Sequence, residues 1–246
     1  MVLALTGLAL VLPACGPDSP IAGDRVTAIT GPTAPAESYL ISVCHRESNG
    51  RFTPILVATS AAAEHFAHGD GQVGRLVPGQ GEAKFGPDCS AIPLVPATIT
   101  FSSLSGNASP FAAIVESGFT ISPRSGAWEA LTTYGHPAPC VVFRRLPSSS
   151  DVAAEIEVRA DGELFTFRAV ELYSSITKIP YVITGRIDAV EVLSLSGTVP
   201  NTFGYFATVV NPNAPALMDT LVIRVVNPAT PCCSNPAGLD NISLKR

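Results

Sequence analysis

The sequence has little charge and few of the residue types that carry common chemistry. Only 14% of its 246 residues are charged, the formal net charge is -5, and there are four His and one Trp. The only runs of basic residues are the pairs Arg144–Arg145 and Lys245–Arg246. Because nucleic-acid binding needs a basic face for the phosphates, we expect no nucleic-acid partner.

The signature motifs of common enzymes are absent as well. The chain contains no G-x-S-x-G, no P-loop and no H-E-x-x-H. Glu155 and Glu157 alternate as glycosidase carboxylates can, but the neighbouring Asp151, Arg159 and Asp161 favour an ordinary solvated strand face. The sequence therefore favours a protein without catalytic activity.

What the chain does have is typical of an all-β exported protein: 22 Pro, 20 Gly and many Ser, Thr and Val. Short β-type runs separated by turn residues lie near 97–104, 111–121, 140–146, 152–160, 163–173, 180–187, 189–196, 202–210, 218–227 and 238–245. Asp161–Gly162 is predicted to be a hairpin turn between two of them. Residues 94–246 are thus predicted to form an antiparallel β-sandwich of the jelly-roll type, in a mainly β protein.

The first fifteen residues, M-V-L-A-L-T-G-L-A-L-V-L-P-A-C, are apolar but too short to span a bilayer, which is typical of a secretory signal. Their end, Leu12-Pro13-Ala14-Cys15, resembles the bacterial lipobox. The resemblance implies cleavage before Cys15, lipidation of Cys15 and anchoring to a membrane of the bacterial cell envelope. A plain secretory signal with an incidental Cys is the alternative. Residues 16–38 are predicted to be a flexible tether.

Export predicts that most of the remaining cysteines pair, because the compartment is oxidising. They are Cys44, Cys89, Cys140, Cys232 and Cys233, an odd number, so one is left over or pairs elsewhere. Adjacent cysteines strain a bridge between them. We therefore expect Cys232 or Cys233 to pair with Cys140.

Residues 39–90 are predicted to form a small ββα module. Strands at 39–45 and 51–57 flank an Asn49–Gly50 turn, an Ala-rich helix covers 60–68, and 71–88 is expected to be a loop. The module contains V-C-H at 43–45, I-x-V at 55–57 and A-x-x-H-x-x-H-G-D from Ala62 to Asp70. This pattern resembles a short module of exported bacterial proteins, in which a downstream Cys, here Cys89, closes the unit.

Two accounts of this Cys/His module remain open. In the first, a Cys44–Cys89 disulfide staples a unit too small to stabilise itself, and the histidines serve capping and packing roles. In the second, His65 and His68 share a helix face and bind zinc with Cys44 and either Cys89 or Asp70. Export favours the disulfide. A His65, His68 and Asp70 metal site beside an intact disulfide is a further possibility.

The β-rich region has its own resemblance. Ile99-Thr-Phe-Ser-Ser-Leu104 at its start and Asp240-Asn241-Ile242 at its end are similar to the first and last strands of carbohydrate-binding-module-like jelly rolls. The resemblance implies a structural Ca²⁺ near the terminal strands, for which Glu171, Asp240 and Asn241 are the candidate oxygen ligands. The alternative is that Asp240–Asn241 only shape a turn.

A sugar-binding surface would show exposed aromatic side chains that stack on pyranose rings. The candidates are Trp128, Tyr134 and Tyr205, with core or rim packing as the alternative for each. The sequence as a whole predicts a lipid-anchored surface lipoprotein with a binding or adhesion role, whose partner is a membrane through the lipid and possibly a polysaccharide. Its rivals are a metal-dependent hydrolase that uses His65, His68 and Asp70, and a structural envelope protein.

Overall fold

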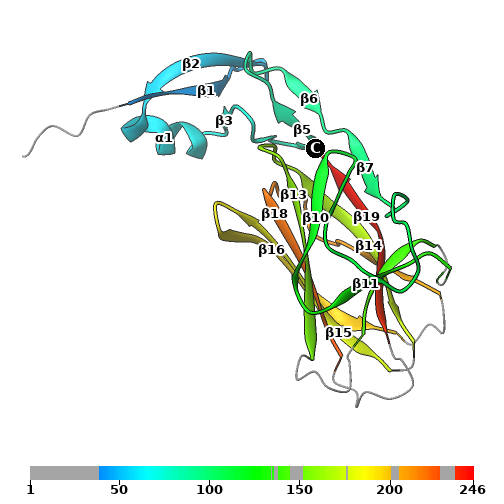
Figure 1. Ribbon diagram of the computed structural model, residues 1–246. Coiled ribbons are helices and arrows are strands. Elements are labelled where there is room, and N and C mark those ends of the chain that lie inside the picture. The colour runs from blue at the N-terminus through cyan, green and yellow to red at the C-terminus, as the bar shows by residue number, and fades with distance from the viewer. Residues whose placement is uncertain are drawn as a thin grey trace, which may run out of the picture. The chain divides into compact units, whose positions relative to one another are not determined.

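The computed structural model describes residues 39–133, 135, 138–144, 152–175, 177–200, 205–227 and 236–246 (Figure 1). By its contacts the chain divides into 1–37 and 38–246, and all described residues belong to the second unit. The predicted signal, the tether, Tyr134, Cys232 and Cys233 lie outside the described residues. Within the described ranges, no helix has the length and apolar character needed to cross a bilayer.

The predicted ββα arrangement is present at the start of the described chain. Strands β1 (Leu40–Arg46) and β2 (Phe52–Ala58) pair antiparallel, and η1 (Thr59–Ala61) leads into α1 (Ala62–Ala67). Gly50 has φ 82° in the turn between the strands, and Gly69 has φ 91° after the helix. These are left-handed conformations that glycine adopts without steric cost. Strand β3 (Gly71–Gln72) then pairs with the other edge of β1.

The expectation of a loop over 71–88 is wrong. After β3, strands β4 (Leu76–Val77), β5 (Gln80–Phe85) and β6 (Ala91–Pro93) form a second three-stranded sheet. The glycines that suggested a loop sit in its turns, since Gly74 and Gly79 both have positive φ. Val77, Ala83 and Phe85 are buried in an apolar cluster. Their burial stabilises strands in this segment, although its glycines and prolines favour turns.

The expected Cys44–Cys89 disulfide is present, and its two cysteines are 45 residues apart in sequence. Both cysteines are buried in a small apolar cluster with Val77, Ala83 and Phe85. The disulfide therefore joins the β1 hairpin to the segment that follows β5. It also removes both thiols from any metal site, which excludes the account with Cys ligands.

The β-rich region is an antiparallel sandwich of two sheets, as predicted (Figure 1). The six-stranded sheet, in the order β16-β15-β18-β13-β10-β9, contains β9 (Ile114–Glu116), β10 (Phe119–Ser125), β13 (Ala153–Ala160), β15 (Ile179–Ile187), β16 (Val190–Val199) and β18 (Thr220–Val226). The seven-stranded sheet, in the order β17-β14-β19-β12-β11-β8 with β7 beside β19, contains β7 (Pro96–Ile99), β8 (Ser109–Pro110), β11 (Trp128–Leu131), β12 (Cys140–Phe143), β14 (Thr166–Ser174), β17 (Ala207–Val210) and β19 (Ala237–Lys245).

The predicted hairpin turn at Asp161–Gly162 is wrong. Strand β13 belongs to the six-stranded sheet and β14 to the seven-stranded sheet, so this connection crosses between the layers. A two-residue hairpin instead joins β15 and β16, where Asp188 and Ala189 have φ 49° and 66°. Positive φ at both central residues defines a type I′ turn, which matches the twist of a hairpin although neither residue is Gly.

The core lies between the two sheets. Along β13 the side chains alternate, with Ala154, Ile156 and Val158 buried and the residues between them facing solvent. The inner faces of β10, β14, β15, β18 and β19 contribute Phe, Ile, Leu and Val to the same cluster. The outer face of the six-stranded sheet carries the charged side chains of the solvent-facing strand positions, and this face forms the main candidate site.

Candidate functional site

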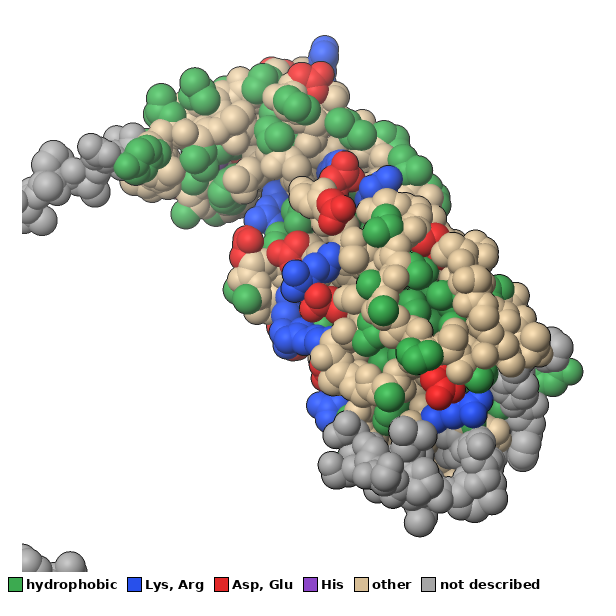
Figure 2. All heavy atoms as spheres, viewed as in Figure 1, with side chains coloured by type: hydrophobic (Ala, Val, Ile, Leu, Met, Phe, Trp, Pro, Cys, Tyr) green, Lys and Arg blue, Asp and Glu red, His purple; other side chains and the backbone are tan. Residues whose placement is uncertain are grey.

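The outer face of the six-stranded sheet carries a mixed lattice of charges, which Figure 2 shows on one flank of the sandwich. Its members come from the solvent-facing positions of four neighbouring strands: Arg124 of β10, Glu155, Glu157 and Arg159 of β13, Arg224 of β18, and Arg186 of β15. The period-two geometry of a strand places them there, because alternate residues fill the core. We call these six residues the charged face.

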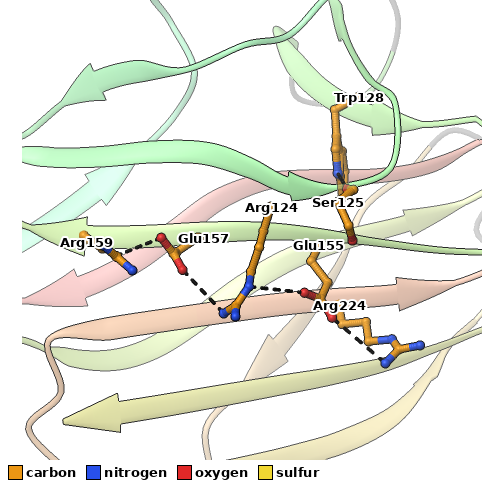
Figure 3. Close-up of polar contacts among 7 residues, drawn as sticks. All are labelled: Arg124, Ser125, Trp128, Glu155, Glu157, Arg159 and Arg224. Atoms are coloured by element: carbon orange, nitrogen blue, oxygen red, sulfur yellow. Dashed lines mark hydrogen bonds and ion pairs between the residues drawn. The ribbon is translucent and has the colours of Figure 1, made fainter. Parts of the chain in front are cut away.

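Ion pairs link most of the charged face (Figure 3). Arg124 lies between the two glutamates, with Nη1 3.5 Å from Glu157 Oε2 and Nε 3.7 Å from Glu155 Oε2. Arg159 Nε is 2.8 Å from Glu157 Oε1, and Arg224 Nη1 is 4.0 Å from Glu155 Oε1. The arginine side chains are 44–60% exposed. Exposed pairs of this kind contribute about 0–1 kcal/mol each, so an incoming anion can replace them at little cost.

A hollow of about 230 Å³ lies within this face. It is lined by Arg124, Glu155, Val182, Thr184, Arg186, Val222 and Arg224. The Arg186 guanidinium makes no hydrogen bond or ion pair with any residue that the structure describes. Three arginines thus surround the hollow with one carboxylate, which leaves surplus positive charge in a chain of net charge -5.

The sequence did not identify these arginines as a site. The pattern of charges predicted that Glu155 and Glu157 belong to a solvated strand face. This prediction agrees with the ion pairs of Arg124 with both glutamates and of Arg159 with Glu157. The surplus comes from Arg186 and from strands that are distant in sequence. Only the sheet order, which places β10, β13, β18 and β15 side by side, brings the charges together.

The predicted aromatic platform does not form at Trp128. Its side chain is buried, at 3% exposure, it contacts Phe143, and its Nε1 donates a hydrogen bond to the carbonyl of Ser125 (Figure 3). Strand alternation turns Trp128 into the core of the sandwich. Tyr205 is 65% exposed and precedes β17. Tyr134 lies outside the described residues.

The predicted calcium ligands do come together, on the seven-stranded sheet. Glu171 of β14 lies opposite Asp240 of β19, and Asn241 Nδ2 donates to Glu171 Oε2 at 2.8 Å. Strand β19 pairs with β12 up to Leu239 and with β7 from Ile242 onward. Asp240 and Asn241 therefore occupy the change of partner, where Asn241 takes φ 42° and the ladder is irregular.

A third carboxylate, which the sequence missed, completes this acidic group. Glu116 Oε1 accepts hydrogen bonds from the Thr100 backbone N–H and hydroxyl, both at 2.8 Å. Its Oε2 and Asp240 Oδ1 are buried without a hydrogen-bond partner among the described residues. Buried oxygens of this kind fit a hard cation such as Ca²⁺, which takes carboxylate and amide oxygens as ligands. Glu116 is too far from Asp240 in sequence for any local pattern to reveal it.

The same surroundings perturb the acidity of Asp240. Burial raises the pKa of its carboxyl to about 7, the backbone hydrogen bond of Asn241 opposes this shift, and the Glu171 and Glu116 carboxylates add to it. A group with this pKa is partly protonated near neutrality. A bound cation would supply the positive charge that the three carboxylates lack.

The predicted trio His65, His68 and Asp70 is only partly assembled. His65 Nδ1 is 2.8 Å from Asp70 Oδ2, but the third member of the group is His45, whose Nδ1 is 2.9 Å from the same oxygen. His68 is exposed, and its backbone N–H bonds to the carbonyls of Glu64 and His65 at the helix end. Alternation on β1, which turns Cys44 inward to its disulfide, turns His45 outward to Asp70.

Asp70 is the buried centre of this group, which we call the His–Asp–His cluster. Burial alone would raise the pKa of its carboxyl, but hydrogen bonds from the Arg46 backbone N–H, His45 and His65 together lower it to about 2. Asp70 is therefore an anion at all physiological pH values. It holds two imidazoles that lie 25 and 5 residues away in sequence.

Of the second predicted disulfide, only one cysteine can be described. Cys140 is buried in β12, and its expected partners, Cys232 and Cys233, lie outside the described residues. This pairing stays a prediction.

Comparisons with known proteins do not assign the chain to a family. No family model matches the chain, and no curated protein matches it. The solved structure of TmCBM61 in complex with β-1,4-galactotriose is similar with a TM-score of 0.34 and 12% sequence identity, over 54% of this chain and 90% of that one. A likeness of this size says nothing about the ligand of this chain, because one fold hosts many functions.

Proposed function

We propose that this chain is an exported, lipid-anchored binding protein without catalytic activity, and that its β-sandwich binds an acidic polysaccharide across the charged face. The observation that carries the proposal is the hollow in which Arg186, which makes no ion pair with a described residue, lies with Arg124 and Arg224. Guanidinium groups bind carboxylates and sulfates through paired N–H donors.

The chemistry of this face selects acidic over neutral sugars. Neutral glycans are held largely by stacking on exposed aromatic rings, and no residue that lines the hollow is aromatic. The hollow is smaller than the roughly 300–1,000 Å³ of a typical small-molecule pocket, which suits one sugar unit of an extended chain. Val182, Val222 and Thr184 between the arginines offer the apolar and hydroxyl contacts that a pyranose ring uses.

The anchor part of the proposal rests on the sequence from Leu12 to Cys15. The Cys44–Cys89 disulfide supports export, because structural disulfides persist in oxidising compartments. Non-reducing peptide mapping by mass spectrometry of protein from the native membrane tests this part. It should find an acylated Cys15 at the N-terminus, and an unacylated protein in the cytosol with reduced thiols would contradict it.

The binding part is tested by calorimetry with polygalacturonate and with neutral dextran as the probes. Wild-type protein should bind the acidic polymer only, and Arg186→Ala should weaken binding about 10-fold or more, since a hydrogen bond to a charged group contributes about 1.5–3 kcal/mol. Affinity should also fall with added salt.

Arg51→Ala is the matched control, because Arg51 is an exposed arginine in the β1–β2 hairpin and is not part of the charged face. It should leave affinity unchanged. Equal binding to dextran, or equal losses in Arg186→Ala and Arg51→Ala, would overturn the acidic-glycan proposal. The absence of binding to any polysaccharide would favour a structural role in the envelope.

A further inference from the structure

The His–Asp–His cluster gathers three metal-ligating side chains from separate parts of the fold. His45 lies on β1, His65 on α1, and Asp70 in the turn between α1 and β3. One candidate ligand atom from each lies within 4.8 Å of the other two. We infer that His45, His65 and Asp70 form a binding site for a divalent transition metal of the zinc class, distinct from the charged face.

Two of the three distances in the cluster are close to the spacing between neighbouring ligands of a metal ion. Both Nδ1 atoms lie 2.8–2.9 Å from one oxygen, Asp70 Oδ2. Metal–ligand bonds of about 2.0–2.1 Å place neighbouring ligand atoms about 3 Å apart, so a zinc ion fits with little movement of the side chains. In the metal-free protein the two Nδ1–H groups donate to Oδ2. Zinc would bind through Nδ1, so the single N–H proton of each ring moves through solvent from Nδ1 to Nε2.

A backbone hydrogen bond orients the Asp70 carboxylate as a metal ligand. The Arg46 N–H donates to Asp70 Oδ1 at 2.7 Å, which leaves Oδ2 directed at the two imidazoles. The Asp70 side chain is 2% exposed, and it stays ionised at neutral pH. A buried carboxylate beside two imidazole nitrogens offers a cation one anionic and two nitrogen ligands. The partner that secures the orientation of a ligand in this way is a regular feature of metal sites.

The donor set decides which metal class binds. Two imidazole nitrogens and one carboxylate oxygen suit Zn²⁺ and its transition-metal neighbours, whereas Ca²⁺ and Mg²⁺ take oxygen ligands. The site is also open on one side, since the side chains of His45 and His65 are 46% and 28% exposed. A metal held by three protein ligands keeps at least one position for water or an external ligand.

Calorimetry with Zn²⁺ on the purified, chelator-treated full chain tests the inference. Wild-type protein should bind one equivalent, and Co²⁺ should give a visible absorption band that Zn²⁺ abolishes. His45→Gln and His65→Gln should each weaken zinc binding by more than the roughly 10–100-fold that outer-sphere partners contribute. His45 is the more exposed of the two, so His45→Gln serves if His65→Gln fails to fold.

Two controls give the test its specificity. His68→Gln removes an exposed histidine three residues from His65 and should bind zinc like wild type. Asp240→Asn alters the acidic group of the sandwich and should also leave zinc binding unchanged. No stoichiometric zinc in the wild type, or equal losses in His68→Gln and His65→Gln, would overturn the inference. All zinc ligands lie outside the charged face, so the result is independent of polysaccharide binding.

Discussion

At the scale of single residues, the protein places several carboxylates where solvent cannot reach them. Asp70 and Asp240 are both buried, yet their environments act in opposite directions. Hydrogen bonds from a backbone amide and two histidines keep Asp70 ionised, whereas burial, with the Glu171 and Glu116 carboxylates nearby, raises the pKa of Asp240 to about 7. The local partners of each carboxylate, and not burial alone, determine its charge.

Asp240 gives the protein a pH dependence that can be measured in the presence of chelator. The carboxyl has a pKa near 3.8 when unfolded and about 7 when folded, so between these values the folded state binds one proton more. The free energy of unfolding should therefore fall as pH rises from 4 to 7, by about 4 kcal/mol at most, since one pKa unit corresponds to about 1.4 kcal/mol. Urea unfolding at a series of pH values measures it.

Asp240→Asn is the informative variant for this prediction, because an amide cannot titrate. Its free energy of unfolding should lose the decline between pH 4 and 7. At pH 8, Ca²⁺ should stabilise the wild type and not the variant, because the ion replaces the proton among the three carboxylates. A wild-type curve that rises over this pH range would contradict the raised pKa.

At the scale of elements, the turn between β15 and β16 has a strained backbone. Ala189 has φ 66° and is exposed, and a residue with a Cβ pays roughly 1–2 kcal/mol in the left-handed region. Ala189→Gly should therefore raise the free energy of unfolding by about 0.5–1 kcal/mol, after the entropy of the added Gly is subtracted. Thermal unfolding followed by circular dichroism should show a small rise in Tm.

Ala113→Gly provides the matched comparison for this turn. Ala113 is also exposed but is not among the residues with positive φ, so the same substitution there should lower stability slightly. Equal effects of both substitutions would mean that the turn is not strained.

The elements also show what the sequence could and could not predict. The strand runs from 152 to 245 were found because alternation and turn residues are local signals. The sequence does not predict the β4–β5–β6 sheet, because the glycines of this segment favour a loop, and it does not predict β11. Asp161–Gly162 has the composition of a hairpin, yet only the pairing partners of β13 and β14 decide that the chain changes sheets there.

Candidate sites depended even more on long-range pairing. His65 and Asp70 were found because they lie in one short motif, and Asp240 with Glu171 because of a resemblance in the terminal strands. His45, Glu116 and Arg186 could not be assigned to their groups, since the sheet register brings them there. A single sequence does not reveal the register in which distant strands pair.

At the scale of the whole molecule, the described residues form three apolar clusters of different size. The cluster around the Cys44–Cys89 disulfide is small, and the core between the two sheets is much larger. In the loop-entropy account, a bridge that spans 45 residues contributes about 4 kcal/mol. Replacing both cysteines with Ser should therefore open residues 39–93 while the sandwich stays folded.

Amide hydrogen exchange with mass spectrometry measures this difference directly. In the double Cys→Ser variant, peptides from β1 and β5 should lose protection, and peptides from β13 and β18 should exchange as in the wild type. If the charged face binds polygalacturonate as proposed, the same variant should keep its affinity for this polymer. Loss of protection across the entire chain would show that the cluster around the disulfide and the core between the two sheets unfold as one unit.

Strand β19 lies at the middle of its sheet and pairs with β14 on one side and with β12 and β7 on the other. Until residues 237–245 have left the ribosome, β7 and β12 have no neighbour on that side, and β14 lacks its longest partner. The nascent sandwich is therefore held open during synthesis by its own topology. This late completion is compatible with the export proposed above, because the sandwich cannot close before β19 has been made.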